Sequence, residues 1–158
     1  MVGVLTSLAA GCSFQSAPVK TPDNPGWPKD TDVSSRIESR VIPTYPVGPV
    51  SPVPQFAQTD GETIYPYTMQ NDLSIERGSA SYDVYILEND YLRLEVLPSI
   101  GGRIFSLYDK VARQDVFYRQ VSIKPALVGQ RGAWISGGVE WNFPKGHLIT
   151  TFEPASCT

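Results

Sequence analysis

The stretch GGVEWNFPKGH, residues 137–147, brings a carboxylate, an amide and the chain's one histidine close together in sequence. Its alternating pattern predicts a strand over residues 138–143, in which successive side chains point to opposite faces. One face of that strand would carry Glu140 and Asn142. The other face would carry three apolar residues, Val139, Trp141 and Phe143.

Two interpretations of this strand remain open. In the first, the two aromatic residues pack in the core and the two polar residues face water. In the second, Glu140 and Asn142 lie on a concave sheet surface and hydrogen-bond sugar hydroxyls. Trp134 would then stack on the apolar C–H face of the sugar ring, as aromatic residues do in many pockets.

His147 follows a Pro-Lys-Gly turn that could return its ring to the same face. Near neutral pH an imidazole can donate or accept a proton. Interconversion of sugar anomers needs a base for the anomeric hydroxyl and an acid for the ring oxygen. Glu140 and His147 are therefore predicted as the catalytic pair, and a histidine that only hydrogen-bonds within the fold is the alternative.

Arginines could supply further contacts to a saccharide. Arg103, Arg119 and Arg131 could grip a carboxylated sugar, because a guanidinium group matches a carboxylate in shape and charge; solvated surface arginines are the alternative. The predicted substrate-binding residues are Trp134, Asn142, Arg131 and Arg103.

Other kinds of chemistry have little support in the sequence. A lone histidine without a cysteine or histidine at ligand spacing predicts no metal site, and the lack of a glycine-rich phosphate loop predicts no cofactor. Glycoside hydrolysis normally needs two carboxylates, and four acidic residues follow position 100: Asp109, Asp115, Glu140 and Glu153. With a net charge of -3 and no dense Lys/Arg cluster, nucleic acid is not an expected partner.

The elements that must position these residues are short strands. SYDVYILE (81–88) and YLRLEVL (91–97) flank Asn89 and Asp90, which tolerate turn geometry, so a hairpin is predicted. A third strand, RIFSLYD (103–109), follows a turn.

That turn contains Gly101 and Gly102, which can adopt the positive φ of a tight reversal. DVFYR (115–119) is predicted as a fourth strand. Residues 119–138 lose periodicity, which indicates a glycine-rich loop around Trp134.

The N-terminal residues 1–12, MVGVLTSLAAGC, resemble a lipoprotein signal segment. A short apolar run and small residues precede Cys12, the predicted lipidation site. No basic residue precedes Lys20, so the positive start of such a segment is missing. A buried N-terminal strand is the alternative, and any membrane contact is expected through the lipid anchor alone.

Proline dominates the next part of the chain, where ten of the fourteen prolines fall between Pro18 and Pro66. Proline lacks the amide proton that a β-ladder needs and favours extended geometry. The sequence therefore predicts a Pro-rich extended tether over residues 13–40, followed by a domain over residues 41–158.

Several ordered stretches carry a resemblance to a known family: ENDYLRLEVLPSIGGRIFSLYDK, DVFYR, KPALVGQRGAWISGGVEWNFPKGH and TTFEP. Over about residues 41–154 the chain resembles the N-terminal part of a bacterial family, domain of unknown function 5107 (DUF5107). That family resembles the galactose mutarotase-like superfamily and is often followed by tetratricopeptide repeats.

The resemblance implies an antiparallel β-supersandwich, a fold used by aldose epimerases and by domains of polysaccharide lyases and glycoside hydrolases. Such a fold is longer than this chain, so residues 41–158 are expected to be its N-terminal part. In the epimerases the catalytic glutamate lies late in the fold, so that role does not pass to Glu140 through the resemblance.

The sequence thus predicts an all-β protein, an antiparallel β-sandwich that forms part of a mutarotase-like supersandwich behind a Pro-rich arm. The expected function is a carbohydrate-binding or carbohydrate-active domain of a secreted or cell-envelope bacterial protein. If it is an enzyme, it is expected to be epimerase-like or glycoside hydrolase-like. The alternatives are a non-catalytic interaction or scaffold module and an inactive fragment of a larger enzyme.

Overall fold

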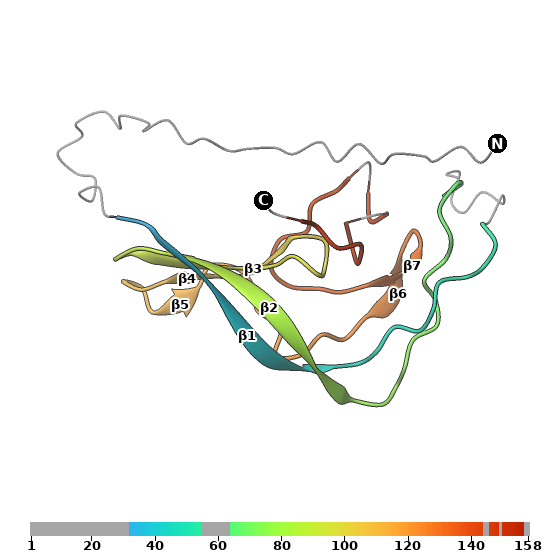
Figure 1. The fold of residues 1–158 in the computed structure, drawn as a ribbon, viewed down its shortest axis with the longest axis horizontal. Coiled ribbons are helices and arrows are strands. Elements are labelled where there is room, and N and C mark those ends of the chain that lie inside the picture. The colour runs from blue at the N-terminus through green and yellow to red at the C-terminus, as the bar shows by residue number, and fades with distance from the viewer. Residues whose placement is uncertain (1–31, 55–63, 144–145, 149, 157–158) are drawn as a thin grey trace, which may run out of the picture. The chain divides into compact units, whose positions relative to one another are not determined.

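The computed structural model describes residues 32–54, 64–143, 146–148 and 150–156. Within these residues the chain forms seven strands and no helix, and the strands assemble into one sheet of order β1-β2-β3-β4-β5 and a second of order β6-β7 (Figure 1). The strands are β1 (Ser34–Thr44), β2 (Gly78–Glu88), β3 (Leu92–Leu97), β4 (Arg103–Asp109), β5 (Gln114–Asp115), β6 (Ala126–Gly129) and β7 (Gly132–Trp134). The prediction of an all-β, antiparallel sandwich-type fold is confirmed.

β1 begins inside the segment that the sequence analysis assigned to the tether. It pairs with β2 along its whole length, and the two strands run side by side in Figure 1. β1 lies at the edge of the sheet, where Pro43 can be tolerated although it has no N–H to donate. Residues 34–40 are therefore part of the sheet rather than of a tether. Residues 1–31, with the predicted signal segment, Cys12 and the rest of the tether, lie outside the described residues.

The predicted hairpin and third strand are confirmed as β2, β3 and β4. Asn89 forms the first turn, because its Oδ1 accepts hydrogen bonds from the backbone N–H groups of Tyr91 and Leu92 at 2.9 and 2.8 Å. Asp109 forms the turn between β4 and β5 in the same way, accepting from the backbone N–H groups of Val111 and Ala112. The predicted fourth strand over residues 115–119 is wrong except at Asp115, because β5 covers only Gln114–Asp115 and residues 116–119 are not in a strand.

The core lies on one face of the five-stranded sheet. Its buried members come from the strands and from the segments that cross them: Ile42, Val84, Ile86, Leu97, Ile100, Phe105, Ile123 and Ile135. Full burial of one such side chain stabilises the fold by about 1.5–3 kcal/mol. Beyond the core, the sheet carries a row of paired charged residues: Arg36, Glu38, Arg40, Glu88, Arg93 and Glu95.

β6 and β7 form a hairpin in the region that the sequence analysis predicted to be a loop. Strict alternation is missing here, because the consecutive apolar residues Leu127 and Val128 are both exposed, at 62% and 66%. Gly132 has a φ of +105° and lies against the backbone of Gln70, with which it forms a parallel bridge. This hairpin places Trp134 at its end.

The predicted strand over residues 138–143 is wrong. Among these residues the structure has one antiparallel bridge, between Val139 and Ile104, and no ladder. Gly137 and Gly138 both have positive φ, at +87° and +63°, which breaks the extended geometry that strict alternation requires. The Glu140 side chain is nearly buried, at 7% exposed, whereas Asn142 is exposed.

Candidate functional site

Glu140 is the centre of a cluster of polar side chains. Its side chain is 7% exposed. Oε1 accepts a hydrogen bond from Thr151 Oγ1 at 2.6 Å, and Oε2 accepts one from Trp134 Nε1 at 2.8 Å. His147 Nδ1 and Arg103 Nη2 lie 2.7 and 3.7 Å from Oε2. We call Glu140 with these four side chains the carboxylate hub.

The hub depends on a close passage of the backbone beside β4. A Cβ atom at Gly138 would lie 1.9 Å from the carbonyl oxygen of Ile104, so a side chain cannot be accommodated there without a shift. The next residue, Val139, exchanges backbone hydrogen bonds with Ile104 at 2.9 and 3.1 Å. These contacts fix the backbone immediately before Glu140 against the start of β4, where Arg103 lies.

Arg103 supplies the positive charge of the hub. Its side chain is 3% exposed, and Nη1 donates to the carbonyl oxygen of Gly137 at 2.7 Å. Burial lowers the pKa of the Arg103 guanidinium, and the nearby Glu140 carboxylate partly opposes this shift. A guanidinium with this degree of burial requires the opposite charge of Glu140, because an unpaired buried charge is strongly unfavourable.

His147 is the member of the hub that reaches solvent, since its side chain is 41% exposed. Neutral His147 must donate from Nδ1 to the Glu140 carboxylate, which leaves the lone pair on Nε2. The ring lies edge-on to Trp134, with centroids 5.6 Å apart and an angle of 64° between the planes. Glu140 is thus placed to orient His147, and Nε2 is the atom that a ligand could meet.

Two predicted substrate-binding residues lie away from the hub. Asn142 is exposed beyond Glu140. Arg131 is buried elsewhere, where it donates to the carbonyl oxygen of Thr68 at 2.8 Å and pairs with Glu153 at 3.0 Å. Its guanidinium also lies 5.8 Å from the ring centroid of Tyr67. The structure therefore brings together Glu140, His147, Trp134 and Arg103 from the predicted set.

Two aromatic residues beside the hub were not identified as binding residues from the sequence. Trp141 and Phe143 are 50% and 63% exposed, so the interpretation that places them in the core is wrong. Trp141 Nε1 donates to the carbonyl oxygen of Gly102 at 2.9 Å, and the N–H of Phe143 donates to Thr150 Oγ1 at 3.3 Å. The two glycines before this segment were the available sign that strand alternation would not hold.

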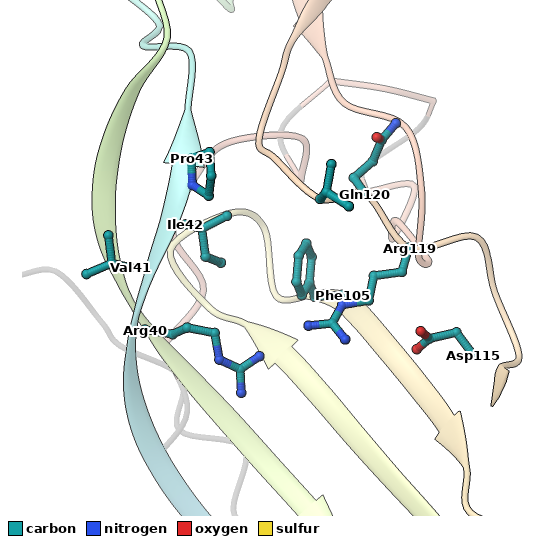
Figure 2. Close-up of a pocket in the computed structure, with 9 residues that line it drawn as sticks. Arg40, Val41, Ile42, Pro43, Phe105, Asp115, Arg119 and Gln120 are labelled. Atoms are coloured by element: carbon teal, nitrogen blue, oxygen red, sulfur yellow. The ribbon is translucent and has the colours of Figure 1, made fainter. Parts of the chain in front are cut away.

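A cavity of about 440 Å³ lies between β1, β4 and the segment after β5 (Figure 2). Its walls include apolar and charged side chains: Arg40, Val41, Ile42, Pro43, Phe105, Asp115, Arg119, Gln120 and Val121. In Figure 2 the guanidinium groups of Arg40 and Arg119 point toward one another beside Phe105. We call this the arginine cavity.

A buried carboxylate holds the arginines of this cavity. Glu95 is 4% exposed, and its oxygens lie 2.6 Å from Arg40 Nη1, 3.0 Å from Arg93 Nη2 and 3.6 Å from Arg119 Nη2. The Arg119 guanidinium also lies 5.3 Å from the centroid of the Phe105 ring, within the range of a cation–π interaction. This cluster was not predicted from the sequence, because it depends on β1, whose pairing brings Arg40 to Glu95.

The described residues contain neither a candidate metal site nor a candidate membrane-spanning helix. No group of three or more His, Cys, Asp and Glu side chains there could hold a metal ion. Nor is any helix of these residues long and apolar enough to cross a membrane.

Comparisons with known proteins identify a family and a similar solved structure. Residues 59–157 match a family model described as domain of unknown function (DUF5107). The fold is similar to the crystal structure of a TPR-domain containing protein from Parabacteroides distasonis ATCC 8503, with a TM-score of 0.66 and 28% sequence identity. The match covers 77% of this chain and 21% of that chain, so this chain spans about a fifth of the other protein's length.

Proposed function

This chain belongs to the DUF5107 family of domains of unknown function, and we propose that it is a carbohydrate-binding domain of a secreted or surface-anchored bacterial protein. The described residues beside the hub, 139–143 and 146–148, would form its saccharide-binding site. The observation that carries the proposal is the exposure of Trp141 and His147, each of which is held by a hydrogen bond to the protein.

Trp141 has the features of a stacking platform. Trp141 is 50% exposed. Because burial of a large apolar ring is favourable, an exposed ring gains stability when a ligand covers it. Its N–H is bound to the carbonyl oxygen of Gly102, which restricts the ring before any ligand arrives. A restricted aromatic ring loses little conformational entropy on binding, and its face suits the apolar C–H face of a sugar.

His147 would supply the polar contact. With Nδ1 committed to Glu140, the neutral imidazole presents Nε2 as an acceptor for a sugar hydroxyl. Glu140 acts through His147 in this proposal, because both carboxylate oxygens already accept hydrogen bonds from the hub. It is a positioning residue rather than a direct ligand contact.

We place the full-length protein at the cell surface in this proposal. The similarity to a TPR-domain containing protein supports tetratricopeptide repeats as neighbours of this domain in a full-length protein. The N-terminal sequence, with Cys12 after an apolar run, supports export and lipid anchoring. A saccharide-binding domain on such a protein would hold glycans at the cell surface.

Isothermal titration with a panel of neutral oligosaccharides containing glucose, galactose, mannose or xylose tests the proposal. For the best ligand, Trp141→Ala should weaken binding at least tenfold, which is about 1.4 kcal/mol. Trp141→Phe keeps an aromatic face and should lose less. Val111→Ala, at an exposed residue of the β4–β5 turn, is the matched control and should bind like wild type. Wild-type protein that binds no member of the panel would refute the proposal, as would unchanged affinity in both Trp141→Ala and His147→Gln.

A second candidate, epimerase-like catalysis, is favoured by the Glu140–His147 contact of 2.7 Å. A carboxylate that orients an imidazole creates a general base at Nε2. The readout is optical rotation of freshly dissolved α-D-galactose. Faster equilibration with wild type than with His147→Gln would indicate catalysis, whereas saccharide binding at an unchanged rate would leave the domain as a binding module.

A further inference from the structure

We propose that the arginine cavity is a second binding site, which takes a sugar acid through its carboxylate. The proposal shares with the proposed function the saccharide class of ligand, but it depends on residues other than 139–143 and 146–148. Arg119 and Arg40 would bind the carboxylate, and the other walls of the cavity would contact the sugar ring.

Three arginines could have held a carboxylated sugar on sequence grounds, and the structure separates them. Arg103 and Arg131 are 3% and 5% exposed and donate to backbone carbonyl oxygens. Arg119 is 39% exposed, and within the described part of the chain its guanidinium makes no hydrogen bond. Its nearest carboxylate oxygen, on Glu95, is 3.6 Å away. Arg119 therefore keeps its donors for a ligand.

The charges around Glu95 also leave Arg119 in excess. One buried carboxylate faces three guanidinium groups. Glu38 lies 3.3 Å from Arg40 and 3.8 Å from Arg93, but its closest partner is Arg36, at 2.7 Å, so it cannot neutralise all of these arginines. Within the described residues no second carboxylate pairs with Arg119. An incoming carboxylate would complete this network.

The orientation of Arg119 suits a bidentate contact. Its guanidinium is held over the ring of Phe105, so the planar fork is restricted before binding. Paired N–H donors of arginine match the two oxygens of a carboxylate and form stronger bonds than neutral donors do. The same restriction lowers the entropy cost of binding.

The rest of the cavity fits a hydroxylated ring better than a simple anion. Ile42, Pro43 and Phe105 provide apolar surface. Asp115, which accepts a hydrogen bond from Ser106, is an acceptor for ligand hydroxyls and would repel a carboxylate placed beside it. A volume of about 440 Å³ lies within the usual range for small-molecule sites. This arrangement predicts one end of the ligand at Arg119 and its hydroxyls toward Asp115.

Titration of the protein with D-glucuronate, D-glucose and acetate tests the proposal. Glucuronate should bind at least tenfold tighter than either glucose or acetate. Arg119→Gln should weaken glucuronate binding at least tenfold. Arg119→Lys keeps the charge but loses the planar guanidinium, so its affinity should lie between those of wild type and Arg119→Gln. Arg77→Gln, at an exposed arginine outside the cavity, is the matched control and should leave the affinity unchanged. An unchanged urea midpoint in all three variants shows that each is folded.

Each contrary result overturns the proposal in a distinct way. Equal affinity for glucuronate and glucose means that the charge is not recognised, and equal affinity for glucuronate and acetate means that the ring is not. Undiminished glucuronate binding in Arg119→Gln places the site elsewhere. Trp141→Ala should leave glucuronate affinity intact, and Arg119→Gln should leave neutral saccharide affinity intact, so the failure of one site is distinguishable from the failure of the other.

Discussion

In the carboxylate hub one buried carboxylate is surrounded mainly by neutral donors, whereas in the arginine cavity one buried carboxylate is surrounded by guanidinium groups. Glu140 accepts hydrogen bonds from a hydroxyl and an indole, contacts an imidazole and has a single arginine nearby. Glu95 has three arginines within 3.6 Å. Each site is thus centred on a glutamate, but the neighbours of Glu140 are mostly neutral and those of Glu95 are positively charged.

The difference separates a structural role from a binding role. At Glu140 the acceptor sites are filled from within the protein, so the carboxylate holds the chain from Trp134 to Thr151 together. At Glu95 the cations outnumber the carboxylate, so positive charge and free donors remain at the wall of a cavity. Removal of the Glu140 carboxylate from the first site should therefore affect folding, and removal of the Arg119 guanidinium from the second should affect ligands.

The largest effect is expected from Glu140→Ala, which leaves the buried charge of Arg103 without a partner. Breaking a buried ion pair in this way typically costs about 3–5 kcal/mol, a large part of the stability of an ordinary domain. Urea unfolding followed by tryptophan fluorescence measures the loss. Glu76→Ala, at an exposed glutamate without an ion pair in the described residues, should change the unfolding free energy by less than about 0.5 kcal/mol. A loss in Glu140→Ala no larger than in this control would contradict the structural role of the hub.

A smaller loss is expected from Gly138→Ala, which disturbs the backbone passage before the hub. A non-glycine residue at a φ of +63° costs about 1–3 kcal/mol, and the new Cβ would also meet the Ile104 carbonyl oxygen. Gly78→Ala is the matched control, because its Cβ would make an ordinary contact of 3.7 Å with Thr44. Thermal unfolding of both variants provides the comparison. Equal midpoints would show that the passage beside β4 does not support the hub.

The parts of the fold that the sequence predicted are those set by local patterns. The hairpin of β2 and β3 follows from alternating residues around Asn89, and β4 follows from the glycine turn before it. β1 was missed because its pairing partner lies far along the chain and proline is frequent around it. Local composition indicates an extended chain there but does not reveal which strand it joins.

The candidate site was predictable in composition but not in geometry. Trp134, Glu140 and His147 were identified by residue type, whereas the contacts of Glu140 with His147 and Thr151 depend on the fold. Asn142 was grouped with Glu140 by strand alternation, but residues 140–143 form no ladder, and Asn142 is exposed whereas the Glu140 side chain is nearly buried. The burial of Glu140 depends on its contacts with His147 and Thr151, and a sequence pattern alone does not specify them.

The smallest effect is expected at the exposed end of the charged row that contains Glu95. Hydrogen bonds from Lys110 and from Arg36 lower the pKa of Glu88 from 4.5 to about 2 in the folded protein. Above about pH 5 the carboxylate is charged whether the chain is folded or unfolded, and its contribution to stability is fully present. As the pH falls from 4.5 toward 2, the unfolded chain binds the proton first, so this contribution is lost.

Unfolding of wild type and Glu88→Gln between pH 6 and pH 2 checks this prediction. The variant should lose less stability than wild type over the interval from about pH 4.5 to 2, and Lys110→Gln should flatten the curve in the same direction. The difference should be smaller than the effect of either previous substitution, because exposed ion pairs contribute little. Parallel curves for wild type and Glu88→Gln would show that the ion pairs of Glu88 do not depress its pKa in solution. Added salt should reduce the difference between the curves, since screening weakens exposed charges far more than the buried pair of Glu140 and Arg103.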